Sequence, residues 1–155
     1  MDELIEKGYN RNICPITGSM AALGDSWSLL IVRECFLGFR RFDEFQRNLS
    51  MSKSVLTRKL KALINNDILF TRSYQNLGQR ARKEYLLTDK GKELYKVIIA
   101  LLEWGNQYLD HQDIKLAVFD RAHHQPAKLI LKSSNEQELS RRDIRLGILE
   151  SPEND

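Results

Sequence analysis

Cysteine and long apolar runs are both scarce in this chain. Two cysteines among 155 residues do not make a disulfide framework, and a reducing compartment would keep both as thiols. No apolar run approaches the roughly 20 residues that span a bilayer. The segment Met1 to Lys7 has neither the basic nor the apolar region of a signal peptide. We therefore expect a cytoplasmic protein without membrane contact.

Patterns for catalysis and for metal binding are missing as well. An enzyme needs a convergent set of acids, bases or nucleophiles, yet the histidines are only His111, His123 and His124, and no glycine-rich phosphate-binding loop occurs. Zinc needs about four thiolate or imidazole ligands, more than His123 and His124 supply. We expect no enzymatic activity, no metal and no cofactor.

Positive charge, by contrast, is concentrated in one part of the chain. Gly38 to Lys83 holds eleven Lys and Arg against three Asp and Glu, a balance of +8. The whole chain has a net charge of +3, so the remainder carries −5. A solvated helix face normally mixes its signs, whereas binding to phosphates needs a concentrated positive field. This distribution predicts contact with nucleic acid.

Two short amphipathic segments joined by Ser50-Met51-Ser52 lie inside the basic stretch. At about 100° per residue, one side of the second segment is apolar, with Leu56, Leu60, Leu63 and Ile64. The other side is polar, with Ser54, Thr57, Arg58 and Lys61. Ser52 can cap a helix that starts near Lys53, and the first segment carries the apolar stripe Phe42, Phe45 and Leu49. The pattern predicts a helix-turn-helix, although two ordinary surface helices would look alike.

A hairpin is predicted directly after the second helix. Ile68 to Tyr74 is rich in β-branched and aromatic residues, and Tyr85 to Leu87 resumes after a polar tip, Gln75 to Ala81. An ordinary surface hairpin with charged edges is the alternative. Its position behind a basic helix pair favours a wing that reaches DNA phosphates or the minor groove.

The remaining segments predict helices. The first runs from Pro15 to Leu23 and ends at Gly24, and the second, central one runs from Asp25 or Ser26 to about Leu37. After the hairpin, Thr88 can cap one long helix whose apolar stripe suggests burial against a second copy. It could instead cover only its own core. The predicted dimer interface is Leu94, Val97, Ile98, Leu101, Leu102 and Tyr108.

Several motifs resemble those of the HxlR family of prokaryotic transcriptional regulators, relatives of the MarR-type winged-helix proteins. These motifs are Cys14-Pro15, Leu23 to Glu34, Gly38 to Phe42, Val55 to Leu60, Glu84 to Thr88 and Glu103-Trp104-Gly105. The resemblance spans about Ile13 to Tyr108 and implies a homodimer that binds double-stranded DNA at a palindromic operator. The proline usual in the family wing near Arg80 and Ala81 is absent, whereas Arg82 matches a basic position of that wing.

We therefore interpret the chain as a sequence-specific transcriptional regulator, specifically a repressor. A winged-helix module for protein contacts is the alternative, and the basic balance disfavours it. The residues expected to face bases are Ser54, Thr57, Arg58 and Lys61. Those expected to face phosphates are Arg41, Lys53, Arg72, Arg80, Arg82 and Lys83.

Cys14 is the candidate for signal sensing. It stands at the start of a helix, where unpaired amides and the helix dipole favour a thiolate. In similar family members a Cys-Pro at this place serves as a switch for oxidants or electrophiles. Packing at a dimer interface is the alternative role. Cys35 falls inside the central helix, and we expect it in the core.

The expected fold is mainly α with a small β-hairpin wing. Residues 10–112 would form the DNA-binding and dimerisation domain, and residues 113–155 a C-terminal extension. Arg142 to Arg145 resembles the end of a ribbon that carries a Cys-x-x-Cys pair in some relatives, but Lys132 and Asn135 stand in the place of that pair. We expect a metal-free ribbon, with strands near 116–119 and 128–131 and disorder over 150–155.

Overall fold

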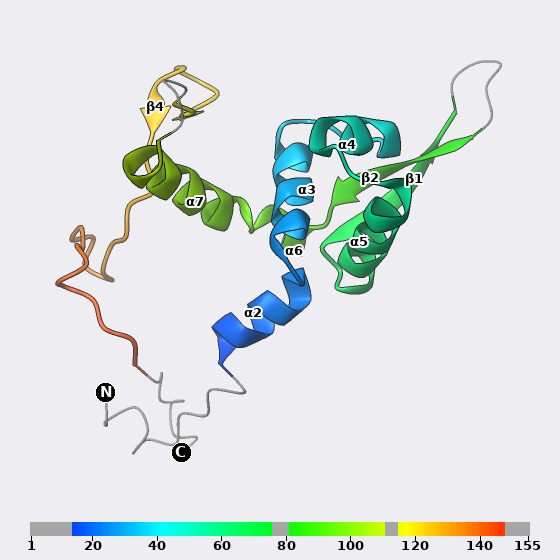
Figure 1. Ribbon diagram of the computed structural model, residues 1–155. Helices are drawn as coiled ribbons and strands as arrows, with labels where there is room; N and C mark the ends of the chain where they lie inside the picture. The colour runs from blue at the N-terminus through cyan, green and yellow to red at the C-terminus, as the bar shows by residue number, and fades with distance from the viewer. Residues whose placement is uncertain (1–13, 76–80, 111–114, 148–155) are drawn as a thin grey trace, which may run out of the picture.

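The computed structural model describes residues 14–75, 81–110 and 115–147. It is mainly helical with a small antiparallel hairpin, as predicted, and the hairpin lies at the opposite end from α7 and β4 (Figure 1). Arg80, most of the predicted hairpin tip and residues 150–155 lie outside the described residues. The elements in chain order are α2 Pro15–Leu23, α3 Ser26–Phe36, α4 Phe42–Leu49, α5 Lys53–Asn65, β1 Leu69–Tyr74, β2 Arg82–Leu87, α6 Asp89–Lys92, α7 Tyr95–Tyr108, β3 Val118–Phe119 and β4 Pro126–Ala127.

Helix α3 is the centre of the domain, as its apolar pattern predicts. It contacts α2, α4, α5, β2 and α7, and its Ile31 and Val32 are fully buried. The caps predicted between α2 and α3 are confirmed. Gly24 ends α2 with a positive φ, and the Asp25 side chain caps α3 by accepting a hydrogen bond from the Ser28 amide. The core also includes Phe45, Leu49, Leu56, Leu60, Leu63, Ile68 and Leu69.

A buried carboxylate joins α3 to the helix-turn-helix. Glu34 is 3% exposed, and its two oxygens accept hydrogen bonds from the Arg33 guanidinium at 2.7 Å and the Asn48 amide at 2.8 Å. A buried charge is tolerated when it is both paired and hydrogen-bonded. The bond to Asn48, in α4, therefore helps to fix α4 on the central helix.

The helix-turn-helix forms from α4 and α5, and one part of its turn departs from the prediction. Ser52 caps α5 by accepting a hydrogen bond from the Val55 amide at 3.4 Å, as expected. The sequence predicts a polar turn over Ser50-Met51-Ser52, but Met51 is only 6% exposed. Ser50 adopts a left-handed conformation, φ 51°, and the Met51 amide bonds back to the Gln46 carbonyl. This reversal directs Met51 into the core.

The hairpin is fastened to the start of α4. β1 pairs with β2 from Leu69 opposite Leu87 to Tyr74 opposite Arg82, close to the predicted strands. The Tyr85 amide donates to the Arg40 carbonyl at 2.8 Å. The base of the wing is thus tied by backbone bonds to the segment that leads into α4.

The prediction of one long helix after Thr88 is wrong. Thr88 caps the short α6 by accepting from the Gly91 amide at 2.9 Å, and α7 begins only at Tyr95. The Leu94 amide donates to the Gly91 carbonyl, three residues back, and this tighter 3₁₀-type bond interrupts the α-helix between α6 and α7. Gly91 is packed against the Ile68 carbonyl, so tertiary contact holds α6 on the hairpin.

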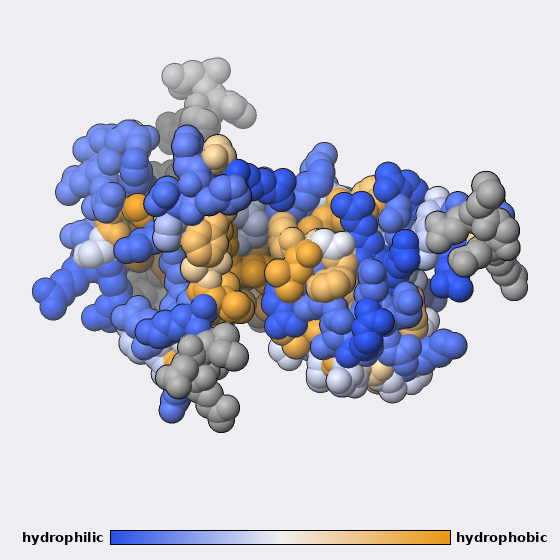
Figure 2. Space-filling model, turned by 90° about the horizontal axis from the view of Figure 1, so that it is seen from above, coloured by the Kyte–Doolittle hydropathy of each residue, from blue (hydrophilic) through white to orange (hydrophobic). Residues whose placement is uncertain are grey.

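The apolar stripe of α7 is divided between two environments. Leu94 and Ile98 pack against the core of their own chain, so the alternative that the stripe covers its own domain holds for these two. Val97, Leu101 and Tyr108 are 38%, 50% and 63% exposed. Figure 2 shows apolar side chains gathered in the middle of one face, between the two ends of the molecule. The dimer interface itself remains a prediction.

The extension contains a short ribbon whose second strand lies earlier than predicted. β3 pairs with β4, with Phe119 opposite Pro126, whereas the second strand was expected over 128–131. The Asp120 carboxylate accepts hydrogen bonds from the backbone amides of Ala122, His123 and Gln125. These bonds close the turn tightly, so the strand that follows it begins already at Pro126.

Candidate nucleic-acid interface

Helix α5 presents the predicted polar face to solvent. Its apolar residues Leu56, Leu60 and Leu63 are buried, and the four residues predicted to face bases, Ser54, Thr57, Arg58 and Lys61, are all exposed. The Thr57 hydroxyl donates to the Lys53 carbonyl at 2.7 Å, so its proton is used within the helix. Arg58 and Lys61 are the long donors on this face.

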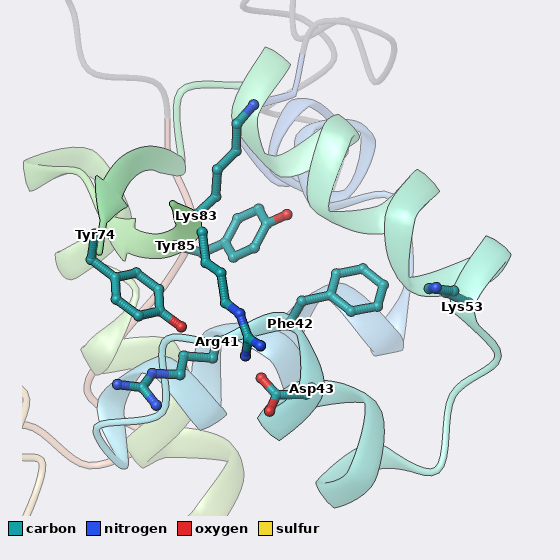
Figure 3. A pocket seen from close by; sticks show the side chains of 8 residues that line it. Arg41, Phe42, Asp43, Lys53, Tyr74, Lys83 and Tyr85 are labelled. Carbon is teal, nitrogen blue, oxygen red and sulfur yellow. The ribbon is translucent and has the colours of Figure 1, made fainter. Parts of the chain in front are cut away.

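Cations from three elements line one open pocket (Figure 3). Arg41 precedes α4, Lys53 begins α5, and Arg82 and Lys83 begin β2. Asp43 is the one acidic residue in the lining. The aromatic lining residues are Phe42, Tyr74 and Tyr85. Four of the six residues predicted to contact phosphates therefore meet at one place, where the wing joins the helix-turn-helix.

Both the backbone and the guanidinium group of Arg41 are held by neighbouring side chains. Its backbone amide donates to Glu44 Oε2 at 2.8 Å, as the Arg40 amide does at 2.9 Å. Its guanidinium carbon lies 4.8 Å from the centre of the Tyr74 ring, within the range of a cation–π contact. Figure 3 shows this pair at one end of the pocket and Lys53 at the other. Tyr74 was not among the predicted site residues.

Arg72 lies outside the pocket lining. It stands opposite Glu84 in the hairpin, and its Nε donates to Glu84 Oε1 at 2.6 Å. The carboxylate compensates part of the positive charge, although the Arg72 side chain remains 59% exposed. Its contact with phosphate stays a prediction, and Arg80 lies outside the described residues.

Lys59 belongs to the basic stretch but faces the protein. Its Nζ forms an ion pair with Asp25 Oδ2, and its side chain is only 16% exposed. The hydrogen bond from Lys59 lowers the pKa of Asp25 below its ordinary value of 3.8. Because the charge of Lys59 is compensated, the +8 balance overstates the charge available for phosphates. The pair instead fastens α5 to the start of α3.

This pair predicts a stability that depends on pH. Because the pKa of Asp25 is lowered in the folded protein, its stabilisation is complete above the unfolded pKa and is lost as the pH falls through the folded pKa. Asp25→Asn, which preserves the helix cap, should lower the free energy of unfolding near neutral pH by roughly 0.5–1 kcal/mol. Urea unfolding should show this difference shrinking below about pH 4. In a Lys59→Met background the same change should have little effect, and an undiminished effect there would contradict the pairing.

The two cysteines lie in different environments. Cys14 is half-buried at the N-cap position of α2, with Pro15 at the first helical position. Cys35 is half-buried rather than fully buried and packs against the core. Burial raises the pKa of Cys35 to about 12, so it stays a thiol near neutral pH and is a poor nucleophile.

Across residues 14–75, 81–110 and 115–147, no three His, Cys, Asp or Glu side chains gather where they could hold a metal ion. In the same ranges no helix has both the length and the apolar character needed to cross a membrane.

The fold and the basic pocket define a winged helix-turn-helix protein of the DNA-binding class. A family model described as HxlR-like helix-turn-helix matches residues 22–113. The chain belongs to this family of DNA-binding transcriptional regulators.

Proteins of similar sequence and structure carry the names of transcription regulators or transcription factors. The uncharacterized HTH-type transcriptional regulator Rv3095 of Mycobacterium tuberculosis is 32% identical over 129 residues, which are 81% of this chain and 80% of Rv3095. The crystal structure of PA1607, a candidate transcription factor, superposes with a TM-score of 0.77 at 30% identity over 88% of this chain and 96% of PA1607. The oxidized redox regulator HypR superposes with a TM-score of 0.56 at 27% identity, over 63% of this chain and all of HypR. Proteins of this class are generally not enzymes.

Proposed function

We propose that this protein is a sequence-specific repressor that binds a palindromic operator as a homodimer. The observation that carries the proposal is the convergence of Arg41, Lys53, Arg82 and Lys83 on one pocket at the start of α5. In this proposal residues 10–112 form the DNA-binding and dimerisation domain, and residues 113–155 are an extension of it.

Helix α5 would enter the major groove. Arg58 is the best candidate for reading a base, because its guanidinium fork matches the two acceptors of guanine. Lys61 and Ser54 would contact neighbouring positions, while Thr57 would offer its methyl group and hydroxyl oxygen. The wing would lie along the backbone or the minor groove, where Arg72 and Arg80 join the pocket cations in contacting phosphates.

Two alanine substitutions distinguish base recognition from phosphate binding. Arg58→Ala should reduce the preference for the operator over other sequences by about 1–3 kcal/mol at the contacted base pair. Arg82→Ala should weaken binding to all duplexes alike and reduce the slope of log affinity against log salt by about one. Electrophoretic titrations of operator and scrambled duplexes at several salt concentrations measure both effects. Unchanged titrations for both variants would remove these two assignments.

The homodimer is supported by two apolar helix surfaces. α2 contains no charged residue, and Leu23 is its one buried residue, while Ile16 and Met20 are 60% and 55% exposed. Together with the exposed part of α7, they suit burial against a second copy. The residues proposed for this interface are Leu94, Val97, Ile98, Leu101, Leu102 and Tyr108. Because Leu94 and Ile98 also pack against the core of their own chain, the exposed Val97, Leu101 and Tyr108 would make most of the contact. A dimer would place two α5 helices about one turn of DNA apart.

Cys14 is proposed as the residue through which an oxidant or electrophile controls binding. Its place at the start of α2 favours the thiolate, and α2 belongs to the proposed dimer surface. The similarity to HypR, named as a redox regulator, agrees with this role.

Oxidant treatment of the wild type should change its affinity for DNA by at least about tenfold, the scale of a typical coupling between sites. Cys14→Ser should bind equally before and after treatment. Cys35→Ala, which leaves Cys14 in place, should respond as the wild type does. Equal affinity of the wild type in both states would end the proposal for Cys14.

A further inference from the structure

Tyr74 differs in burial from the residues before it on β1. From Phe70 to Ser73 the strand is exposed, whereas Tyr74, at its end, is half-buried. Its ring lies against the guanidinium of Arg41, 4.8 Å from the ring centre. A residue near the outer part of the hairpin is thereby held against the segment that begins α4.

The contact fixes the orientation of Arg41 as well as its position. The backbone of Arg41 is held by Glu44 Oε2 and pairs with Glu84 in β2, so the side chain starts from a fixed point. An arginine whose guanidinium carbon lies over an aromatic ring can still donate, from the N–H groups that do not meet the ring, to other acceptors. A phosphate oxygen entering the pocket would meet a guanidinium that is already held in place.

The same contact extends the attachment of the wing toward its tip. The base of the hairpin is tied to the segment before α4 by the Tyr85 amide and the Arg40 carbonyl. Tyr74 lies opposite Arg82, further along the hairpin, next to the cations that line the pocket. Holding Tyr74 therefore also holds the backbone that carries Arg82 and Lys83.

We propose that Tyr74 is a positioning residue for DNA binding. It orients Arg41 toward a backbone phosphate and holds the wing at the angle at which Arg82 and α5 meet the same duplex. This inference rests on the proposed function, because it concerns how the proposed interface is preorganised.

Substitutions at Tyr74 test the role of the ring. Tyr74→Leu should weaken binding to operator and scrambled duplexes by about tenfold and reduce the salt slope by about one, as one phosphate contact is lost. Tyr74→Phe, which keeps the ring, should restore most of the affinity and slope. Phe70→Leu makes a comparable change at an exposed aromatic residue of the same strand and should bind as the wild type does.

Hydroxyl-radical protection of an operator duplex locates the lost contact. With Tyr74→Leu, protection of the backbone next to the wing should disappear while protection around α5 remains. Arg41→Met should produce the same pattern, and the double variant should be no weaker than either single variant, because both changes remove one unit. If Tyr74→Leu does not fold, Tyr74→Thr, which also removes the ring and suits a strand, takes its place in both measurements.

Three results would overturn the inference. Equal affinity and slope for Tyr74→Leu and the wild type would show that the ring does nothing for binding. Equal losses in Tyr74→Phe and Tyr74→Leu would assign the effect to the hydroxyl group. A wild type without salt-dependent affinity for any duplex would overturn the proposed function together with the inference, whereas the first two results leave the proposed function intact.

Discussion

Gly91→Ala is expected to lower the free energy of unfolding by about 3 kcal/mol, the upper end for an overpacked site. A Cβ atom at Gly91 would overlap the carbonyl oxygen of Ile68 and lie 3.1 Å from its carbonyl carbon. That oxygen already accepts a hydrogen bond from the Thr88 amide at 3.1 Å. Because the obstacle is backbone rather than a flexible side chain, α6 must move away from the hairpin. Urea unfolding followed by circular dichroism measures the loss.

Gly18→Ala is the matched control for this experiment. Gly18 lies inside α2, and a Cβ atom there would meet nothing within 4 Å. Alanine in a helix interior is favoured over glycine by roughly 0.5–1 kcal/mol, so this variant should be as stable as the wild type or slightly more so. Equal stability of Gly91→Ala and the wild type would contradict the close packing of α6 on the Ile68 carbonyl.

Reversing both wing cations, Arg82→Glu with Lys83→Glu, is expected to lower the affinity for any duplex by about a hundredfold or more at low salt. Both side chains line the basic pocket, and the change replaces two attractions to phosphate with two repulsions. Fluorescence anisotropy with labelled operator and scrambled duplexes measures the loss. The effect should be similar for both duplexes, because phosphates carry no sequence information.

Arg141→Glu with Arg142→Glu controls for the change in net charge. Both residues are exposed in the extension, outside the pocket lining, and reversing them alters the charge of the chain by the same amount. This control should bind within about twofold of the wild type, since exposed charges farther away than a Debye length are screened. Equal losses in the two double variants would mean that total charge, not the pocket, governs affinity.

Much of the helix-turn-helix could be predicted from the sequence, because local rules determine it. Apolar residues at helical spacing identified the buried side of α5, and Ser52 and Gly24 marked helix ends through their caps and conformations. The hairpin strands followed from β-branched and aromatic content. Each of these signals is contained within a few neighbouring residues.

The features that were missed depend on contacts between distant segments. Lys59 pairs with Asp25, which is 34 residues away in the sequence. A count of charges within the basic stretch therefore does not show that the positive charge of Lys59 is compensated. Gly91 meets the Ile68 carbonyl, a close contact between α6 and the residue before β1 that helical periodicity does not reveal. Met51 is buried because Ser50 reverses the chain in a left-handed conformation. A serine in the sequence does not predict that conformation.

In the candidate site, too, local signals identified some residues, whereas contacts between distant segments determine others. Lys53 was identifiable because it stands at the predicted start of a helix, Arg41 because it directly precedes the apolar stripe that begins at Phe42, and Arg82 because it matches the resemblance. Strand alternation could have drawn attention to Tyr74, which lies on the same side of β1 as Arg72. Nothing local shows that Arg72 pairs with a carboxylate while Tyr74 meets a guanidinium, since hairpin register and the position of α4 decide both.

The most direct test of DNA recognition is a salt titration with duplexes selected from the native genome by binding to the wild-type protein. We expect nanomolar affinity for the selected duplex and a preference of about a thousandfold over scrambled duplexes near physiological salt. Affinity for both should fall steeply between roughly 50 and 200 mM salt. Micromolar affinity that changes with neither the duplex sequence nor the salt concentration would contradict the proposal. It would favour a winged helix that contacts proteins instead.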